Sequence, residues 1–392
     1  MKFIAKTLEG LEETLAKEIA LLGGTEIETV NRAVLYSGDL SLLYSSNLWL
    51  RSCLRVLLFM QEFTVRNEND LYDEIKKIPW ESYFGLEETF AIDSVVNSSI
   101  FKHANYLSLK TKDAIADRFT EKYGSRPNVD TQNPNLRINI HIREDIVTLS
   151  LDSSGSSLHM RGYRKSHVDA PLNEVLAAGL IMLSDWDKTT TLIDPMCGSG
   201  TILCEAYAIA SNSPPQGYHR HFGFMDWNNF DNVLWEKICK TAKNQQKTTD
   251  LPKILGFDKL DKAVEASITN IEIAGYQEYI SVEKEDFFYQ EMTRDAFLIF
   301  NPPYDARIRE DEILDFYKYI GDKLKRSFED STAWLLSGHI PAMKNVGLRP
   351  SRKIHLLNGS IPSLYCKYDL YKGSKKQKWQ QIQNISNDTN TT

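Results

Sequence analysis

Residues Thr191–Ala210 read TLIDPMCGSGTILCEAYAIA and combine a short apolar run, a glycine turn and an alanine-rich segment. Leu192 and Ile193 predict a buried strand, and the composition after Gly200 predicts a helix. Gly198 and Gly200 have no Cβ, so the backbone can turn sharply and a ligand can approach the free amides of the following helix N-terminus. The stretch therefore predicts a strand, a turn and a helix that together bind a cofactor.

The residues around the two glycines bear on which cofactor this is. A nucleotide-phosphate loop would need a third glycine or a GK[ST] ending, but Gly200 is followed by Thr201 and no lysine. Phosphate binding is therefore the less favoured interpretation. Asp194, four residues before Gly198, is placed to receive an ammonium group, which suits the amino-acid portion of S-adenosylmethionine. An aspartate that only caps the turn is the structural alternative.

A second motif, Asn301-Pro302-Pro303-Tyr304, follows the apolar run Phe297–Phe300. Again a buried strand ends in a polar turn. DPxCGSGT followed by NPPY resembles the class I S-adenosylmethionine-dependent methyltransferases that modify exocyclic amino groups of bases. The resemblance assigns cofactor binding to the residues of the first motif, namely Asp194, Pro195, Cys197, Gly198, Gly200 and Thr201.

The chemistry of such a reaction explains the residue types of the second motif. An exocyclic base nitrogen is a poor nucleophile because its lone pair is delocalised into the ring, so the site must orient it and accept its hydrogens. The Asn301 side-chain oxygen and the Pro302 carbonyl are suitable acceptors, and the restricted backbone of Pro302 and Pro303 holds them in place. Tyr304 can stack on an extruded base. An ordinary turn with an aromatic lid is the structural alternative.

Composition limits the other possibilities. The 392 residues, 42% of them hydrophobic, are enough for two or three domains. No run of eighteen apolar residues occurs, and the N-terminus turns acidic early, which indicates a soluble, cytoplasmic protein without membrane contact. The five cysteines have no paired spacing, so neither a disulfide framework nor a metal site is expected. A net charge of −7 argues against nucleic-acid binding through the whole surface.

The N-terminal part shows helix patterns at residues 11–22 and 40–50 and a strand pattern at residues 53–63. From Val65 a new pattern begins with TFAIDSVVNSS, KTKDAIADRF, RINIHI and LSLDSSGSSLHMRGYR, which resembles the THUMP domain of RNA-modifying enzymes; the segment before it resembles the ferredoxin-like domain often fused to THUMP. The resemblance implies RNA binding. The candidate phosphate contacts are Lys110, Lys112, Arg118, Arg126, Arg137, Arg161, Arg164 and Lys165.

Further acids follow the predicted cofactor helix. Residues 169–183 predict a linker and a helix with a proline at its start, and an aromatic-rich insertion then separates the cofactor helix from the next strand. Asp258 ends that next strand, where such sheets bind ribose hydroxyls. Asp286 ends the third strand, where the family's acid meets the adenine amino group. A helix N-cap is the alternative for each acid.

The resemblance covers nearly the whole chain, from Met1 to about Lys372, and extends to the THUMP-containing guanine-N2 methyltransferases of large-subunit ribosomal RNA. One departure is that Tyr304 is followed by Asp305-Ala306-Arg307, where the family usually has Gly-Glu-Arg. The predicted parts are a ferredoxin-like domain (1–64), a THUMP domain (65–165), a methyltransferase domain (166–372) and a polar tail (373–392). The expected fold is α/β, a Rossmann-like doubly wound sheet preceded by two α+β domains.

The expected function is methyl transfer from S-adenosylmethionine to the N2 amine of a guanosine in 23S ribosomal RNA. The nearest alternative substrate is transfer RNA, and DNA adenine-N6 methylation would not need a THUMP domain. A non-catalytic RNA-binding or assembly factor is the alternative from another class, against which the intact motifs argue. A cytosine-C5 enzyme would need a cysteine nucleophile beside its catalytic proline. The oligomeric state is not predicted.

Overall fold

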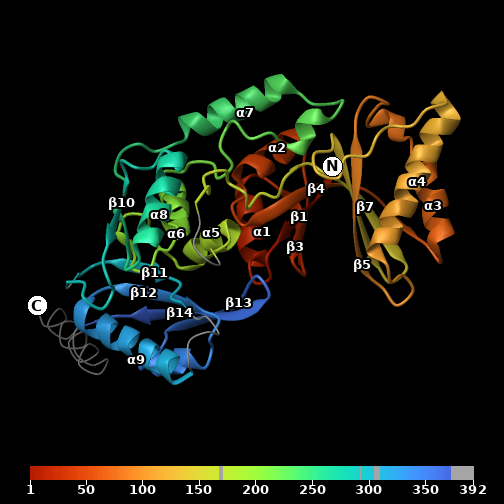
Figure 1. Cartoon of the computed structure of the whole chain (residues 1–392). Helices are drawn as coiled ribbons and strands as arrows, with labels where there is room; N and C mark the ends of the chain where they lie inside the picture. The colour runs from red at the N-terminus through yellow and green to blue at the C-terminus, as the bar shows by residue number, and fades with distance from the viewer. Residues whose placement is uncertain (167–170, 292, 304–309, 372–392) are drawn as a thin grey trace, which may run out of the picture. The chain divides into compact units, whose positions relative to one another are not determined.

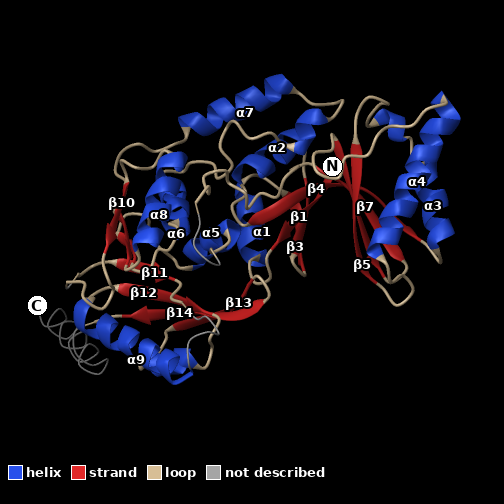
Figure 2. Cartoon of the chain, in the orientation of Figure 1, coloured by secondary structure: helices blue, strands red, loops and turns tan. Residues whose placement is uncertain are grey.

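The computed structural model describes residues 1–166, 171–291, 293–303 and 310–371, which form two compact units. The first unit contains residues 1–161 and 214–245, and the second contains residues 162–213 and the chain from 246 onward. Each unit is built on its own seven-stranded sheet with helices packed against it (Figure 1, Figure 2). The predicted α/β fold class is therefore confirmed.

The sheet of the first unit has the order β2-β3-β1-β4-β7-β6-β5. Its strands are β1 (Lys2–Thr7), β2 (Thr25–Val30), β3 (Ala33–Ser37), β4 (Cys53–Thr64), β5 (Phe90–Asn97), β6 (Leu136–Arg143) and β7 (Ile146–Asp152). The long strand β4 pairs with β1 through its first half and with β7 through its second half. The predicted ferredoxin-like and THUMP segments thus share one continuous sheet.

The helices of the first unit follow their apolar periodicity. They are α1 (Glu12–Leu21), α2 (Leu40–Trp49), α3 (Glu68–Lys77), α4 (Ala104–Tyr123) and α7 (Asn232–Asn244). Helix α4 packs against α3 and β5 through a buried stripe that includes Leu107, Ile115 and Phe119. It ends at Gly124, whose φ of +70° is the left-handed conformation that suits glycine.

The aromatic-rich residues 214–245 lie within the predicted methyltransferase domain in sequence but pack in the first unit. The ring of Tyr44 on α2 stacks on Phe224 with centroids 4.3 Å apart and meets the edge of Trp235 on α7 at 6.3 Å. The Asp231 backbone N–H donates a hydrogen bond to the Tyr44 hydroxyl at 3.0 Å. The insertion therefore completes the core of the N-terminal unit.

We expect Trp235→Ala to destabilise the first unit by about 3–5 kcal/mol, because it leaves a cavity against three aromatic rings. The expected readout is a lower urea midpoint together with faster amide exchange in α2, where Tyr44 lies. Val233→Ala is the matched control, since Val233 is on the same helix but 77% exposed. Equal effects of the two substitutions would show that the aromatic cluster does not stabilise the unit.

The second sheet has the order β10-β9-β8-β11-β12-β14-β13. Its strands are β8 (Leu192–Asp194), β9 (Ile254–Asp258), β10 (Ile280–Lys284), β11 (Phe297–Phe300), β12 (Thr332–Ser337), β13 (Arg352–Asn358) and β14 (Ile361–Asp369). The first five positions in that order are parallel, and β14 and β13 are antiparallel additions at the β12 side. This is the predicted doubly wound sheet, in which the first strand of the unit, β8, is the middle one of the five parallel strands.

Helices cover both faces of this sheet. They are α5 (Glu174–Leu183), α6 (Thr201–Ala210), α8 (Asp261–Ala274) and α9 (Glu310–Ser327). Leu335 of β12 joins the core that contains Tyr317 of α9, whereas its neighbour Trp334 stacks on Tyr365 at 4.5 Å. The Tyr365 hydroxyl donates to the Leu180 carbonyl of α5 at 3.2 Å. Successive residues of β12 therefore face opposite helical layers, as the strand period requires.

Helix α5 begins differently from the prediction. Its N-cap is Asn173, whose side-chain oxygen accepts the N–H groups of Val175 and Leu176, so Pro171 precedes the helix instead of starting it. The asparagine side chain satisfies the free amides more directly than a proline could. Among the described residues, no helix combines the length and the apolar character that crossing a bilayer requires.

Candidate active site

Asp194 is the last residue of β8 and is almost fully buried, at 1% exposure. Its Oδ1 accepts the Met196 N–H at 3.2 Å. Burial raises the pKa of this carboxyl to about 8; the Met196 hydrogen bond opposes this rise, and the negative charge of Asp258 adds to it. The ionised form of a carboxyl group in this environment is strongly stabilised by a cationic partner.

The glycine turn after β8 has two residues in the left-handed region, Gly198 with φ +54° and Gly200 with φ +77°. Gly200 also packs tightly on α8, since a Cβ at this position would lie 2.4 Å from the Ser267 Oγ. Backbone conformation and packing therefore both demand glycine at 200. Cys197 is buried beside the same helix, with its Sγ 3.9 Å from the Ser267 Oγ.

The predicted ribose acid, Asp258, ends β9 and reaches the glycine turn. Its Oδ2 accepts the Gly198 N–H at 3.1 Å, and its Oδ1 accepts the Leu260 N–H at 3.0 Å. Each oxygen therefore keeps acceptor capacity for a hydroxyl. Asp286 lies two residues beyond the end of β10, not on the strand as predicted, and its Oδ1 accepts the Phe288 N–H at 3.0 Å.

The second motif begins directly after β11. The Oδ1 of Asn301 is buried and has no hydrogen-bond partner among the described residues. Pro302 is buried and Pro303 is exposed. Tyr304 and residues 305–307, which differ from the usual family sequence, lie outside the described residues. Because an unpaired buried acceptor costs about 1–3 kcal/mol, Asn301 is suited to a donor that arrives with a ligand.

Parallel pairing brings these residues to one edge of the sheet. Strands β10, β9, β8 and β11 are adjacent and parallel, so their carboxyl ends, which carry or precede Asp286, Asp258, Asp194 and Asn301, meet there. Chain order reverses at β8, the topological switch point at which open α/β sheets bind ligands. Acidic acceptors beside a turn that exposes backbone amides fit S-adenosylmethionine, with its ammonium and ribose hydroxyl groups.

Several of the candidate phosphate contacts have structural roles instead. Arg161 is buried, and its guanidinium donates to the carbonyls of Leu158 and Arg51, so its interpretation as a phosphate contact is wrong. Arg118 forms ion pairs with Glu81, whose pKa it holds well below the usual range. Arg137, Lys112 and Lys110 also have intramolecular partners, whereas Arg126 and Lys165 are exposed.

Sequence reasoning missed a group of side chains that hold the cofactor turn from behind. Asn270 and Ser267 of α8 are fully buried, and Asn270 donates to the Ser199 carbonyl at 3.0 Å. Arg164 donates to the Thr201 hydroxyl at 3.0 Å. The available signal was a polar residue at a core-facing position of a helix: Asn270 follows Ala263, Ala266 and Ser267 at helical spacing.

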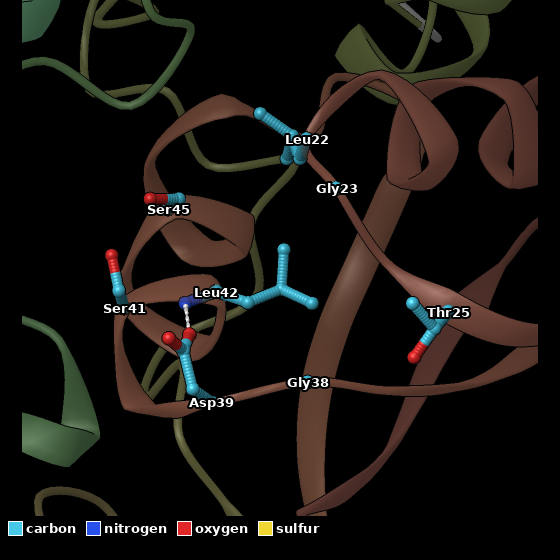
Figure 3. Close-up of a pocket in the computed structure, with 8 residues that line it drawn as sticks. All are labelled: Leu22, Gly23, Thr25, Gly38, Asp39, Ser41, Leu42 and Ser45. Carbon is cyan, nitrogen blue, oxygen red and sulfur yellow. Dashed lines mark hydrogen bonds between the residues drawn. The ribbon is translucent and has the colours of Figure 1, made fainter.

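A separate hollow of about 410 Å³ lies in the first unit (Figure 3). Figure 3 shows the Leu42 side chain extending into it and the Asp39 carboxylate accepting the Leu42 N–H, at 2.8 Å. Asp39 is the charged member of the lining and is engaged as the N-cap of α2. Among the described residues, no group of three or more histidine, cysteine or acidic side chains is arranged to hold a metal ion.

The family model described as the RMKL-like methyltransferase domain matches residues 161–367, more than half of the chain. The chain belongs to the RMKL-like methyltransferases. Two further family models match this methyltransferase, the THUMP domain at residues 65–152 and the RlmL ferredoxin-like domain at residues 2–57. Its fold class, enzyme class and cofactor, S-adenosylmethionine, are those that the sequence predicted.

Relatives of this RMKL-like methyltransferase cover most of its length. A Synechocystis protein described as an RNA methyltransferase is 37% identical over 94% of this chain and 97% of its own. The ribosomal RNA large subunit methyltransferase K/L of Syntrophotalea carbinolica is 33% identical over 94% of this chain and 54% of its own. The chain thus spans about half the length of that K/L relative.

Solved structures also resemble this methyltransferase. The crystal structure of SMU.472 complexed with S-adenosylhomocysteine has a TM-score of 0.86 at 26% identity, over 95% of this chain and 99% of its own. A methylase structure from Clostridium difficile 630 has a TM-score of 0.85 at 31% identity, over the same shares. The fold of both units is therefore a known one.

Proposed function

We propose that this enzyme transfers a methyl group from S-adenosylmethionine to the N2 amine of a guanosine in 23S ribosomal RNA. The observation that carries the proposal is the buried Asn301 Oδ1, which has no hydrogen-bond partner among the described residues. It lies at the carboxyl end of β11, at the same sheet edge as Asp194 and the glycine turn. The THUMP match and the name of the K/L relative support RNA of the large ribosomal subunit as substrate.

The site residues have distinct roles in this proposal. Asp194 would pair with the ammonium group of the cofactor, Asp258 with its ribose hydroxyls, and Asp286 with its adenine amine. Pro195, Cys197, Gly198, Gly200 and Thr201 shape the turn that receives it. S-adenosylmethionine, when bound, supplies a methyl group made electrophilic by the adjacent sulfonium. Every other contribution comes from the protein.

Asn301 orients the nucleophile, which is the exocyclic amine of the guanine. Its Oδ1 accepts one N–H of the exocyclic amine, and the carbonyl of Pro302 offers a second acceptor. These hydrogen bonds orient the amine and draw electron density toward its nitrogen, which makes the lone pair more available for attack. Pro302 and Pro303 have restricted φ and contribute no N–H that would compete for the acceptors. Tyr304 would stack on the base.

Mass spectrometry of nucleosides tests the proposal. Purified 23S RNA and bulk transfer RNA are compared between cells with and without the gene. We expect N2-methylguanosine to be lost from 23S RNA only, and re-expression of the wild-type chain to restore it. Loss from transfer RNA only would replace the substrate while keeping the chemistry. Unchanged methylation in both RNAs would overturn the proposal in favour of a binding factor.

A further inference from the structure

The segment just before the cofactor-binding fold, residues 163–166, lies against the glycine turn within the second unit. Lys165 and Ser166 donate their backbone N–H groups to the Asn270 Oδ1, both at 3.0 Å. The Asn270 Nδ2 donates to the Ser166 carbonyl at 2.7 Å and to the Ser199 carbonyl at 3.0 Å. The fully buried Asn270 side chain thus joins helix α8, on which it lies, to residues 165–166 and to Ser199 in the glycine turn.

Arg164 makes a second tie on the same segment. Its guanidinium donates to the Thr201 hydroxyl at 3.0 Å, at the first residue of α6, and to the Leu172 carbonyl at 2.5 Å. It also lies 3.3 Å from the Glu174 carboxylate, at the first residue of α5. Arg164 therefore connects the beginnings of two helices, one of which follows directly from the glycine turn.

We propose that Arg164 and Asn270 are positioning residues that hold the glycine turn in its cofactor-binding shape. The turn contains two residues in the left-handed region and exposes backbone amides, so its unliganded form would otherwise sample other conformations. Asn270 fixes Ser199, between the two glycines, and Arg164 fixes Thr201 after them. A turn that is preorganised loses less conformational entropy when the cofactor binds.

The proposal rests on cofactor binding at the glycine turn, as in the proposed function, but not on any particular RNA. It is therefore tested by the binding of S-adenosylhomocysteine alone. We expect Asn270→Ala to weaken S-adenosylhomocysteine binding by about 10- to 100-fold in titration calorimetry. Amide exchange at residues 198–203 should become faster in the unliganded protein. Arg164→Ala should also weaken binding, and Arg164→Lys, which keeps the charge beside Glu174, should restore part of it.

Asn47→Ala in the first unit is the matched control. Asn47 is also fully buried, and its side chain donates to the Leu43 carbonyl and the Ser153 hydroxyl and accepts from the Ser154 hydroxyl. The control should lower thermal stability without changing S-adenosylhomocysteine affinity or exchange at the turn. A folded Asn270→Ala protein with affinity within twofold of wild type would overturn the proposal. Failure to methylate 23S RNA would leave this result unaffected.

Discussion

Asn301→Ala is expected to lower the rate of methyl transfer to RNA by about 100- to 1000-fold, while S-adenosylhomocysteine binds as in the wild type. The magnitude is that of removing one preorganised hydrogen-bonding group from an active site. The rate is measured under single-turnover conditions with saturating cofactor, so that cofactor affinity does not enter. Retention of cofactor binding follows because the acids proposed to hold the cofactor lie on β8, β9 and beyond β10, not on β11.

The stability of the same variant separates a catalytic role from a structural one. The Asn301 Oδ1 is buried without a partner in the described part of the chain, so its removal should leave the unliganded protein equally stable or more stable by about 1 kcal/mol. If Asn301 had a structural role, its removal would instead make the unliganded protein less stable. Asn301→Gln displaces the same amide by one methylene and should be nearly as inactive. An alanine variant within tenfold of the wild-type rate would contradict the assignment.

Asp194→Asn is expected to abolish tight cofactor binding and, at the same time, to stabilise the unliganded protein at alkaline pH. The pKa of the Asp194 carboxyl is about 8 in the folded state, against an ordinary value of 3.8, because the group is buried. The folded state therefore binds a proton that the unfolded state releases above pH 4, and the wild type loses stability as the pH rises from about 4 to 8. An uncharged asparagine has no such loss.

The stabilities of the wild type and of Asp194→Asn should therefore diverge as the pH rises. At pH 5 the stability of Asp194→Asn should be close to that of the wild type, and at pH 9 it should be higher by about 2 kcal/mol or more, since each pKa unit corresponds to about 1.4 kcal/mol. Denaturant titrations at both pH values measure this. The affinity of the wild type for S-adenosylhomocysteine should rise toward alkaline pH, where Asp194 is ionised, and the variant should bind at least 100-fold more weakly.

Asp187→Asn is the control for Asp194→Asn, because the pKa of Asp187 is lowered in the folded state whereas that of Asp194 is raised. Although burial opposes it, hydrogen bonds from Thr190 and Thr189 hold the pKa of Asp187 at about 2. Its ionised form therefore stabilises the fold above pH 4, and the asparagine variant should be slightly less stable at neutral pH. Its cofactor affinity should not change. If Asp194→Asn behaved like this control, Asp194 would be a turn-capping residue and not a cofactor ligand.

Features that depend on neighbours in the chain could be predicted well. The strand, turn and helix at Thr191–Ala210 and the strand before Asn301 are observed where they were expected, because side-chain periodicity and glycine positions act locally. The doubly wound sheet also follows from the alternation of strand and helix patterns along the chain.

The sequence by itself determined the fold class, the two motifs and the acids that end β8 and β9. Tertiary structure alone decided that residues 214–245 complete the N-terminal core, that Arg161 is buried, and that Asn270 holds the glycine turn. It also decided the raised pKa of Asp194 and the burial of the Asn301 Oδ1 away from any hydrogen-bond partner in the described part of the chain. The physical reason is that burial and hydrogen-bond partners come from residues far away in the chain, on which local patterns carry no information.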